Sequence, residues 1–238
     1  MCIRDRWERH RRDGRLLRSS RKGVAQGEGF LEDYAFLASA FVDLYEARGS
    51  QAFIWLERAR DLGESIVDLF SAKEGGFYST SRYNEELLLR HREGHDGATP
   101  SANATAAMAL ARLGVHFDRG SFRDLARKAV EAYGIGIERQ PRAFPTSLLV
   151  LDYLRSGPIE VALVGDPSDL RTKALDEALA STFLGRRVIA RGDGSSSTHP
   201  LLRGKTLVNG APAVYLCRNY ACDLPIVDPA ALLQKLNG

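Results

Sequence analysis

The feature that most constrains the fold of this chain is a predicted helix that carries almost no charge. Residues 104–113 contain a single charged side chain, Arg112, among apolar and small residues. A helix with so little charge is expected to be buried on most sides. The polar segment 95–103 leads into this helix. In that segment Gly97 permits a tight turn and Pro100 suits a first helical turn.

Four polar side chains at the beginning of this helix predict a pocket for a polar ligand. They are Asp96, Thr99, Ser101 and Asn103. The first turn of a helix also leaves backbone N–H groups unpaired, so both side chains and backbone can bind a ligand there. The same residue types cap helices, and the sequence does not distinguish the two roles.

Helices of the buried kind alternate along the chain with helices that have one polar face. Apolar residues recur at intervals of three and four in residues 29–47, and residues 143–155 are again rich in leucine. Residues 51–70 and 121–133 combine an apolar stripe with many charges, and Ser121 is the expected N-cap of the later helix. This alternation predicts a mainly α fold, an α/α toroid in which outer helices surround inner helices.

The pattern changes after residue 156 and becomes typical of a small α/β subdomain. Strands are expected at residues 160–165, 187–190, 205–208 and 213–217, with helices at 166–181 and from 228 onward. Within the helical part, residues 75–80 and 87–91 are expected to pair as a β-hairpin. We therefore divide the chain into a basic N-terminal arm (1–22), a partial toroid (23–156) and the α/β subdomain (157–238).

The net charge of +3 comes from the N-terminal arm. Residues 1–22 contain nine Lys or Arg and three acidic residues, which leaves the rest of the chain with a net charge of about −3. A body of this charge does not indicate nucleic-acid binding. We interpret the arm as a solvated terminus, with contact to nucleic acid as the less favoured alternative. Residues 1–6 resemble translated adaptor sequence, so we expect the natural chain to begin further upstream.

The sequence carries no sign of a membrane or secretory destination. No segment has the roughly 20 uncharged apolar residues that a membrane helix requires. The basic N-terminus is not followed by the apolar core of a signal peptide. Besides Cys2 the chain contains only Cys217 and Cys222, which fits a reducing compartment. We therefore predict a cytoplasmic protein without a membrane partner.

Several segments carry a family resemblance. Residues 29–37 (Gly-Phe-Leu-Glu-Asp-Tyr-Ala-Phe-Leu) and 96–103 (Asp-Gly-Ala-Thr-Pro-Ser-Ala-Asn) are the most specific, and further matches lie at 13–18, 44–47, 75–78 and 215–222. In combination they resemble thioredoxin-domain-containing proteins of the spermatogenesis-associated protein 20 type. The resemblance covers roughly residues 7–236, which is nearly the whole chain.

The resemblance implies a fold more firmly than a reaction. In that family a thioredoxin-like domain precedes an (α/α)6 toroid of the six-hairpin glycosidase kind. This chain matches only the last part, so we expect a C-terminal fragment with a partial (α/α)6 toroid. Five helices cannot close a ring of six hairpins. The thioredoxin-like domain and the first toroid helices would then be missing partners of this region.

Three acidic residues are the catalytic candidates. Glu32 and Asp33 begin one inner helix, as Asp96 precedes another. In sugar-processing α/α toroids the pocket lies where such helix openings converge, and sugar chemistry commonly uses one carboxyl as acid and another as base or nucleophile. Neighbouring helical residues point about 100° apart, so only one of Glu32 and Asp33 can act with Asp96. The alternative is that these acids stabilise the helix dipole.

Four further residues are candidates for ligand binding. Tyr34 can stack on a sugar, and Thr99, Ser101 and Asn103 can bind its hydroxyl groups. The alternatives are core packing for Tyr34 and helix capping for the other three. His95 stands beside the motif and is a less favoured candidate for proton transfer.

The remaining histidines and cysteines predict no cofactor or metal site. His91, His116 and His199 have no acidic or histidine partner at ligand spacing. Four residues separate Cys217 from Cys222, whereas two separate the cysteines of a thioredoxin-type pair. A structural zinc site would need two further ligands that the sequence does not supply. We interpret the two cysteines as buried thiols, with redox activity as the weaker alternative.

Two functions from different classes follow. The first is a carbohydrate-interacting region, glycosidase-like or epimerase-like, that acts on a small sugar within the full-length parent protein. The second is a non-catalytic scaffold or client-binding region of a thiol–disulfide redox protein, in which the missing thioredoxin-like domain performs the chemistry.

Overall fold

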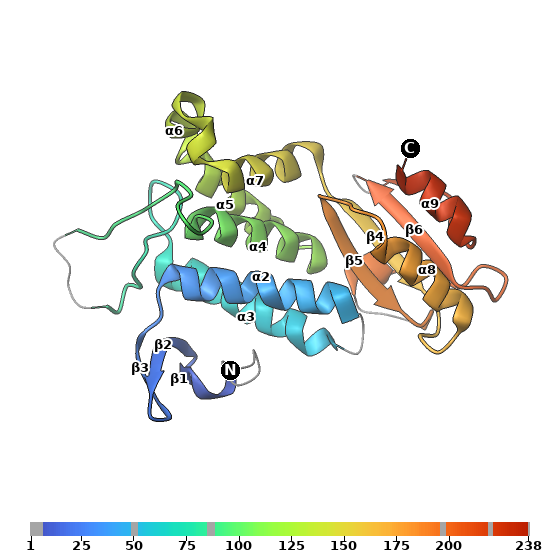
Figure 1. Ribbon diagram of the computed structural model, residues 1–238, viewed down its shortest axis with the longest axis horizontal. Coiled ribbons are helices and arrows are strands. Elements are labelled where there is room, and N and C mark those ends of the chain that lie inside the picture. Colours follow the sequence, from blue (N-terminus) through green and yellow to red (C-terminus); the bar gives the residue numbers. More distant parts are fainter. Residues whose placement is uncertain (1–6, 49–51, 85–88, 196–198, 219–220, 238) are drawn as a thin grey trace.

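The computed structural model describes residues 7–48, 52–84, 89–195, 199–218 and 221–237. About 50% of the chain is helical and 18% lies in the strands of two sheets. A layer of helices occupies the middle of the molecule, with a small sheet beneath it and an α/β unit at one end (Figure 1). The prediction of a mainly helical chain that ends in an α/β part is confirmed at this level.

The helical layer is built on two adjacent helices, α2 and α4. The helices are α2 (Leu31–Arg48), α3 (Phe53–Phe70), α4 (Ala102–His116), α5 (Gly120–Glu131), α6 (Gly134–Arg139) and α7 (Pro145–Ser156). α3 packs on α2 and α5 packs on α4, while α7 contacts both α4 and α5 (Figure 1). The described chain therefore contains two helical hairpins with their buried helices side by side. A toroid stays a prediction.

The burial of these helices follows their composition. Every residue of α4 is buried except Ala102, Met108 and Arg112, as its low charge predicts. α5 instead buries one face and exposes its charges to solvent. Two details of the predicted capping were wrong. Pro100 precedes α4, whose N-cap is Ser101, and α5 begins one residue before Ser121 with no side-chain cap.

α7 is less buried than predicted. Only Ser147, Val150 and Tyr153 are buried in this helix. Leu149 is 63% exposed, and two neighbouring leucines on the same helix are also exposed. α7 rests on α4 and α5 along one narrow face, and no other described element covers its opposite side. Its leucine content therefore did not predict an interior position.

The basic N-terminal segment forms a sheet and is not a solvated arm. Strands β1 (Arg11–Arg12), β2 (Arg15–Arg21) and β3 (Val24–Glu28) pair antiparallel in that order. Leu16 is fully buried, and its N–H donates to the hydroxyl of Tyr34 on α2 at 2.7 Å. The sheet therefore supports the beginning of α2, and it continues past residue 22, where the arm was expected to end.

The C-terminal unit is a four-stranded sheet with two helices on one face. Its strands are β4 (Ile159–Val164), β5 (Arg187–Gly192), β6 (Ala213–Arg218) and β7 (Ala221–Cys222), in the order β5-β4-β6-β7. β4 and β5 are parallel, and the other pairs are antiparallel. Helices α8 (Leu170–Ala180) and α9 (Pro229–Asn237) share an apolar cluster with one face of the sheet. The other face joins the core of the helical layer.

Most of the elements predicted in this unit are confirmed, and two are not. Residues 205–208 contain no strand, and only an isolated bridge between Val208 and Ala211 surrounds the Asn209–Gly210 turn. The hairpin predicted for residues 75–80 and 87–91 lies partly outside the described residues. In its described part no strand forms, although the N–H of Ser79 donates to the carbonyl of His91 at 2.8 Å.

Candidate functional site

A cavity of about 270 Å³ lies where α2 and α4 begin. It is lined by Phe30, Leu31, Glu32, Ser79, Glu93, His95, Gly97, Thr99, Pro100, Ser101 and Ala102. Its polar groups are two carboxylates, one imidazole and three hydroxyls. The openings of the two buried helices therefore converge on one polar hollow, and the residues that contribute to it differ in part from those predicted.

Of the two acids at the start of α2, only Glu32 lines the cavity. Its carboxylate is about half exposed and pairs with Arg18 of β2 at 2.7 Å. The carboxylate of Asp33 accepts the N–H of Phe30 at 2.9 Å and lies 3.5 Å from Arg18. Asp33 thus caps α2 while Glu32 faces the hollow, in keeping with the 100° between successive side chains on a helix.

Asp96 lies outside the cavity and joins the starts of two helices. One of its carboxylate oxygens accepts the N–H of Ser101 at 2.5 Å, and the other accepts the N–H of Thr146 at 2.8 Å. Its own N–H donates to the carbonyl of Ala143 at 2.8 Å. Asp96 therefore ties the beginning of α4 to that of α7, and both of its oxygens are occupied by backbone donors.

The predicted ligand-binding residues divide in the same way. Thr99 and Ser101 line the cavity, and Ser101 is also the N-cap of α4. Tyr34 lies in the core, where burial raises the pKa of its hydroxyl. Asn103 is also buried. Its amide binds the backbone of Phe77 in both directions, at 2.7 and 2.9 Å. These two side chains hold the walls of the site and do not reach its interior.

A pair of residues in the loop before α4 completes the site. The imidazole Nε2 of His95 lies 2.9 Å from a carboxylate oxygen of Glu93, and both side chains are about half exposed. The carbonyl of Glu93 accepts from the amide of Asn103 at 3.0 Å, which anchors this loop to α4. His95 was considered from the sequence, but Glu93 was missed. The available signal was the spacing of two residues, which places alternate side chains of an extended segment on one side.

A second polar cluster lies at the other ends of the same two helices, and it is buried. Glu46 near the end of α2 binds Arg112 at 3.0 Å and His116 at 3.0 Å, both on α4. The Nδ1 of His116 lies 3.3 Å from the Nε2 of His199, and Arg112 also pairs with Asp43 at 2.7 Å. The sequence offers His116 and His199 no acidic or histidine partner at ligand spacing, but the fold brings them partners from distant segments.

The hydrogen bonds of this buried cluster assign both imidazole tautomers. The Nδ1 of His199 accepts the N–H of Leu201 at 3.2 Å, so its Nε2 carries the proton and donates to His116. His116 in turn donates from Nε2 to the carboxylate of Glu46. Burial lowers the pKa of His116, and burial together with His116 lowers the pKa of His199 to about 3. Both rings are therefore neutral at physiological pH.

Glu46 remains charged in this cluster despite its burial. Burial alone would raise the pKa of its carboxyl, but Arg112 and the hydrogen bond from His116 outweigh that effect and lower it. Arg191 of β5 adds a hydrogen bond to the backbone carbonyl of Glu46 and pairs with Asp176 of α8 at 2.7 Å. The cluster thus links the helical layer to the α/β unit. None of its residues lines the cavity at the starts of α2 and α4.

Curated relatives cover nearly all of this chain. Spermatogenesis-associated protein 20 of mouse is 34% identical over 216 residues, and the human protein is 33% identical over 216 residues. The chain is similar to part of spermatogenesis-associated protein 20. The match takes in 88% of this chain but only 27% of each of those two proteins. An uncharacterized protein of Caenorhabditis elegans is 28% identical over 90% of the chain. No family model matches the chain.

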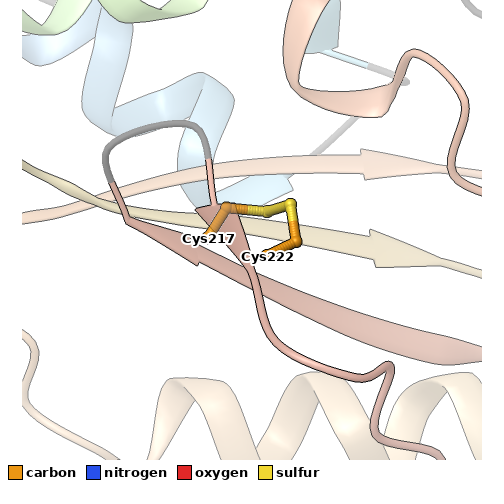
Figure 2. The surroundings of a disulfide bond; sticks show 2 residues. All are labelled: Cys217 and Cys222. Atoms are coloured by element: carbon orange, nitrogen blue, oxygen red, sulfur yellow. A yellow bond between two sulfur atoms is a disulfide. The ribbon is translucent and has the colours of Figure 1, made fainter.

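The two C-terminal cysteines of this chain form a disulfide (Figure 2). Cys217 of β6 and Cys222 of β7 are direct partners in the antiparallel register, with their Cα atoms 3.9 Å apart. The prediction of two free thiols was therefore wrong. The hairpin between them, which the sequence did not predict, brings the two side chains together.

Neither a metal-binding cluster nor a membrane-spanning helix is found in the described part of the chain. No group of three or more His, Cys, Asp or Glu side chains there is arranged to hold a metal ion. None of the described helices is long and apolar enough to cross a membrane. The cytoplasmic location stays a prediction.

Proposed function

We propose that this chain is part of a carbohydrate-binding toroid that holds a small sugar in the cavity between the starts of α2 and α4. The observation that supports this most directly is the convergence of both helix openings on one polar hollow. Each water of the liquid occupies roughly 30 Å³, so a volume of about 270 Å³ corresponds to about nine waters. This is enough space for a ligand of the size of a single sugar unit. We make this proposal for the full-length parent protein, in which a thioredoxin-like domain and the first toroid helices would precede this region.

The lining residues can divide the work of sugar binding among them. The hydroxyls of Ser79, Thr99 and Ser101 can donate to or accept from ligand hydroxyls. The carboxylates of Glu32 and Glu93 accept hydrogen bonds. They can replace the hydrogen bonds to water that a polyol loses on binding. Backbone N–H groups at the start of α4 add donors that no side chain needs to supply.

Glu32 and Glu93 are the carboxyl pair best placed for glycosidase-like or epimerase-like chemistry. Glycoside chemistry uses one carboxyl to protonate a leaving group and another to activate water or attack carbon. Contact with Glu93 can hold the His95 ring in place for proton transfer. Asp96 and Asp33, which the sequence favoured, act in this proposal through the helix openings that they hold in place.

The test is a calorimetric titration of monosaccharides and simple glycosides into this chain and into its full-length parent. Glu93→Gln and Thr99→Val should each weaken binding of the preferred sugar about tenfold, the equivalent of roughly 1.4 kcal/mol. Glu131→Gln, at the exposed end of α5, is the matched control and should change nothing. Absence of both binding and turnover across the panel in the parent would refute the proposal.

A client-binding scaffold is the second candidate function, and one groove favours it. A cavity of about 760 Å³ runs between β6, β7 and α9, with apolar lining from Leu216, Ala221 and Leu236. Charged side chains stand in the same groove, among them Arg218 and Lys235. If this groove binds extended polypeptide, a photoreactive residue at Gln234 will cross-link to reduced, unfolded ribonuclease. The same residue at Glu131 will not.

A further inference from the structure

The Cys217–Cys222 disulfide lies at the margin of the C-terminal sheet. β7 is two residues long and pairs only with β6, whereas β6 is held to β4 by five register pairs. The bridge spans a sequence separation of 5. Closing so short a loop removes less chain entropy from the unfolded state than closing a long one. The position of β6 therefore does not depend on the bridge.

The two ends of the bridge differ in their access to solvent. Cys217 is only 2% exposed, whereas Cys222 belongs to an exposed strand. A disulfide is opened by a thiolate that attacks one of its sulfurs, so access decides which sulfur is attacked. Here the accessible side is Cys222, and Cys217 would be the leaving sulfur.

An acidic residue is the cross-strand neighbour of the buried cysteine. Glu160 of β4 is the direct cross-strand partner of Cys217. Such partners point to the same face of the sheet, with Cβ atoms about 4.5–5.5 Å apart. Burial raises the pKa of Glu160, Lys205 and Arg123 act in the opposite direction, and Asp118 acts in the same direction as burial. A raised pKa favours the protonated form of this carboxyl, and a protonated carboxyl can supply a proton to a thiolate that forms nearby.

We propose that Cys217 and Cys222 form a reversible thiol–disulfide exchange site that reacts with a partner dithiol, with Glu160 as the proton donor to Cys217. The partner thiolate attacks the Sγ of Cys222, and the Cys217–Cys222 bond breaks. Its electron pair passes to the Sγ of Cys217, which takes the proton of Glu160. The second thiol of the partner then attacks the mixed disulfide and releases Cys222, which is protonated by water.

The overall reaction is balanced without a further reactant. The chain's disulfide is reduced to two thiols and the dithiol is oxidised to a disulfide, while solvent returns the proton to Glu160. The reverse reaction regenerates the bridge when an oxidised partner is in excess. This site involves neither the sugar cavity nor the helices that form it, so its test is independent of the proposed function.

The first experiment measures exchange in the folded chain, in a Cys2→Ser background that leaves only the pair. The protein is equilibrated with mixtures of reduced and oxidised dithiothreitol, free thiols are alkylated, and the mass is read. We expect complete and reversible conversion with an unchanged circular dichroism spectrum. Two results would overturn the proposal: a bridge that resists dithiol until denaturant unfolds the chain, or two thiols that are free in the oxidised, purified protein.

Single-cysteine variants test the assigned roles. With Cys217→Ser, the thiol of Cys222 should form a mixed disulfide with 5,5′-dithiobis(2-nitrobenzoate) at least tenfold faster than Cys217 does in the Cys222→Ser variant. Equal rates would contradict the assignment of Cys222 as the attacked sulfur. Glu160→Gln should slow reduction by dithiothreitol about tenfold at pH 7 and remove one inflection from the pH profile of the rate. Glu131→Gln is the control, and an unaltered profile in Glu160→Gln would exclude the proton-donor role.

Discussion

The starts and the ends of α2 and α4 contain similar polar residues, but these residues are exposed at the starts and buried at the ends. At their starts, Glu32, Glu93 and His95 surround an open hollow and are each about half exposed. At their ends, Glu46 and His116 are almost fully buried and bind one another. Carboxylates and imidazoles that face solvent keep bonding capacity for a ligand. The same groups, when buried, must satisfy one another because an unpaired buried charge is strongly unfavourable.

The comparison shows that residue type alone does not indicate function in this fold. Each end contains glutamate, arginine and histidine, and at each end a salt bridge connects separate elements. What differs is the neighbouring layer. The α/β unit closes one end through β5 and the 3₁₀ turn η3 (Pro200–Leu202), while at the other end the described segments that precede α2 and α4 line an open hollow.

The largest effect should come from removing the buried negative charge with Glu46→Gln. Arg112 and His116 then lose their shared partner in a nearly dry environment. We expect the free energy of unfolding to fall by about 3 kcal/mol. Urea denaturation measures it, with the exposed Glu131→Gln as control. A loss below about 1 kcal/mol, typical of a surface ion pair, would show that the two ends do not differ in the way described.

Acid should weaken the buried end next. The pKa values of His116 and His199 are lowered in the folded state, mainly by burial, so the unfolded chain binds more protons below pH 6.5. Stability is therefore lost as the pH falls through 6.5, by up to about 1.4 kcal/mol per pH unit for each imidazole. Urea titrations at pH 7.5 and 5.5 measure this slope.

A histidine at the open end provides the matched control for that pH dependence. His95→Gln removes an imidazole outside the buried cluster, with a side chain that is 57% exposed. His199→Gln should reduce the slope. Equal slopes in all three proteins would contradict the assignment of acid sensitivity to the buried cluster.

A smaller effect is expected from Asp96→Ala, which frees the starts of α4 and α7. Loss of a helix-capping side chain usually costs about 1 kcal/mol, and this carboxylate caps two helices, so we expect a loss of about 2 kcal/mol. The exposed Asp124→Ala on α5 serves as control. If instead stability is retained and only sugar binding disappears, Asp96 belongs to the ligand site. Its assignment as a residue that only holds the starts of α4 and α7 would then be wrong.

The smallest effect on stability should come from Glu32→Gln at the open end. Its ion pair with Arg18 is about half exposed, so we expect a change within about 0.5 kcal/mol. Affinity for the preferred sugar should nevertheless fall about tenfold. A stability loss above 1 kcal/mol would mean that this end, too, is held together by its charges.

Much of the helical layer could be predicted from the sequence because its signals are local. The near absence of charge in residues 104–113 correctly predicted the burial of α4. The mixed composition of residues 121–133 correctly predicted the exposed face of α5. Leucines were a weaker guide in α7, since burial requires a covering element that composition does not reveal. The arginines of residues 9–21 obscured the strands that form there.

The cavity lies in the region that the sequence favoured, but its lining residues were only partly predicted. Helix openings rich in Asp, Thr and Ser indicated this region, and Glu32, Thr99 and Ser101 line the cavity, while a ligand site there stays a prediction. Asp96 and Asn103 look identical in sequence whether they bind a ligand or the backbone. The structure shows them bound to backbone groups.

The sequence by itself determined most of the helices, most strands of the C-terminal sheet and many of their apolar faces, because periodicity and turn chemistry act between near neighbours. Only the tertiary structure decided which charges meet. Glu46 and His116 are 70 residues apart, and His116 and His199 are 83 apart. Their pairing depends on how whole elements pack. A buried charge is stable only where that packing brings its partner within hydrogen-bonding distance.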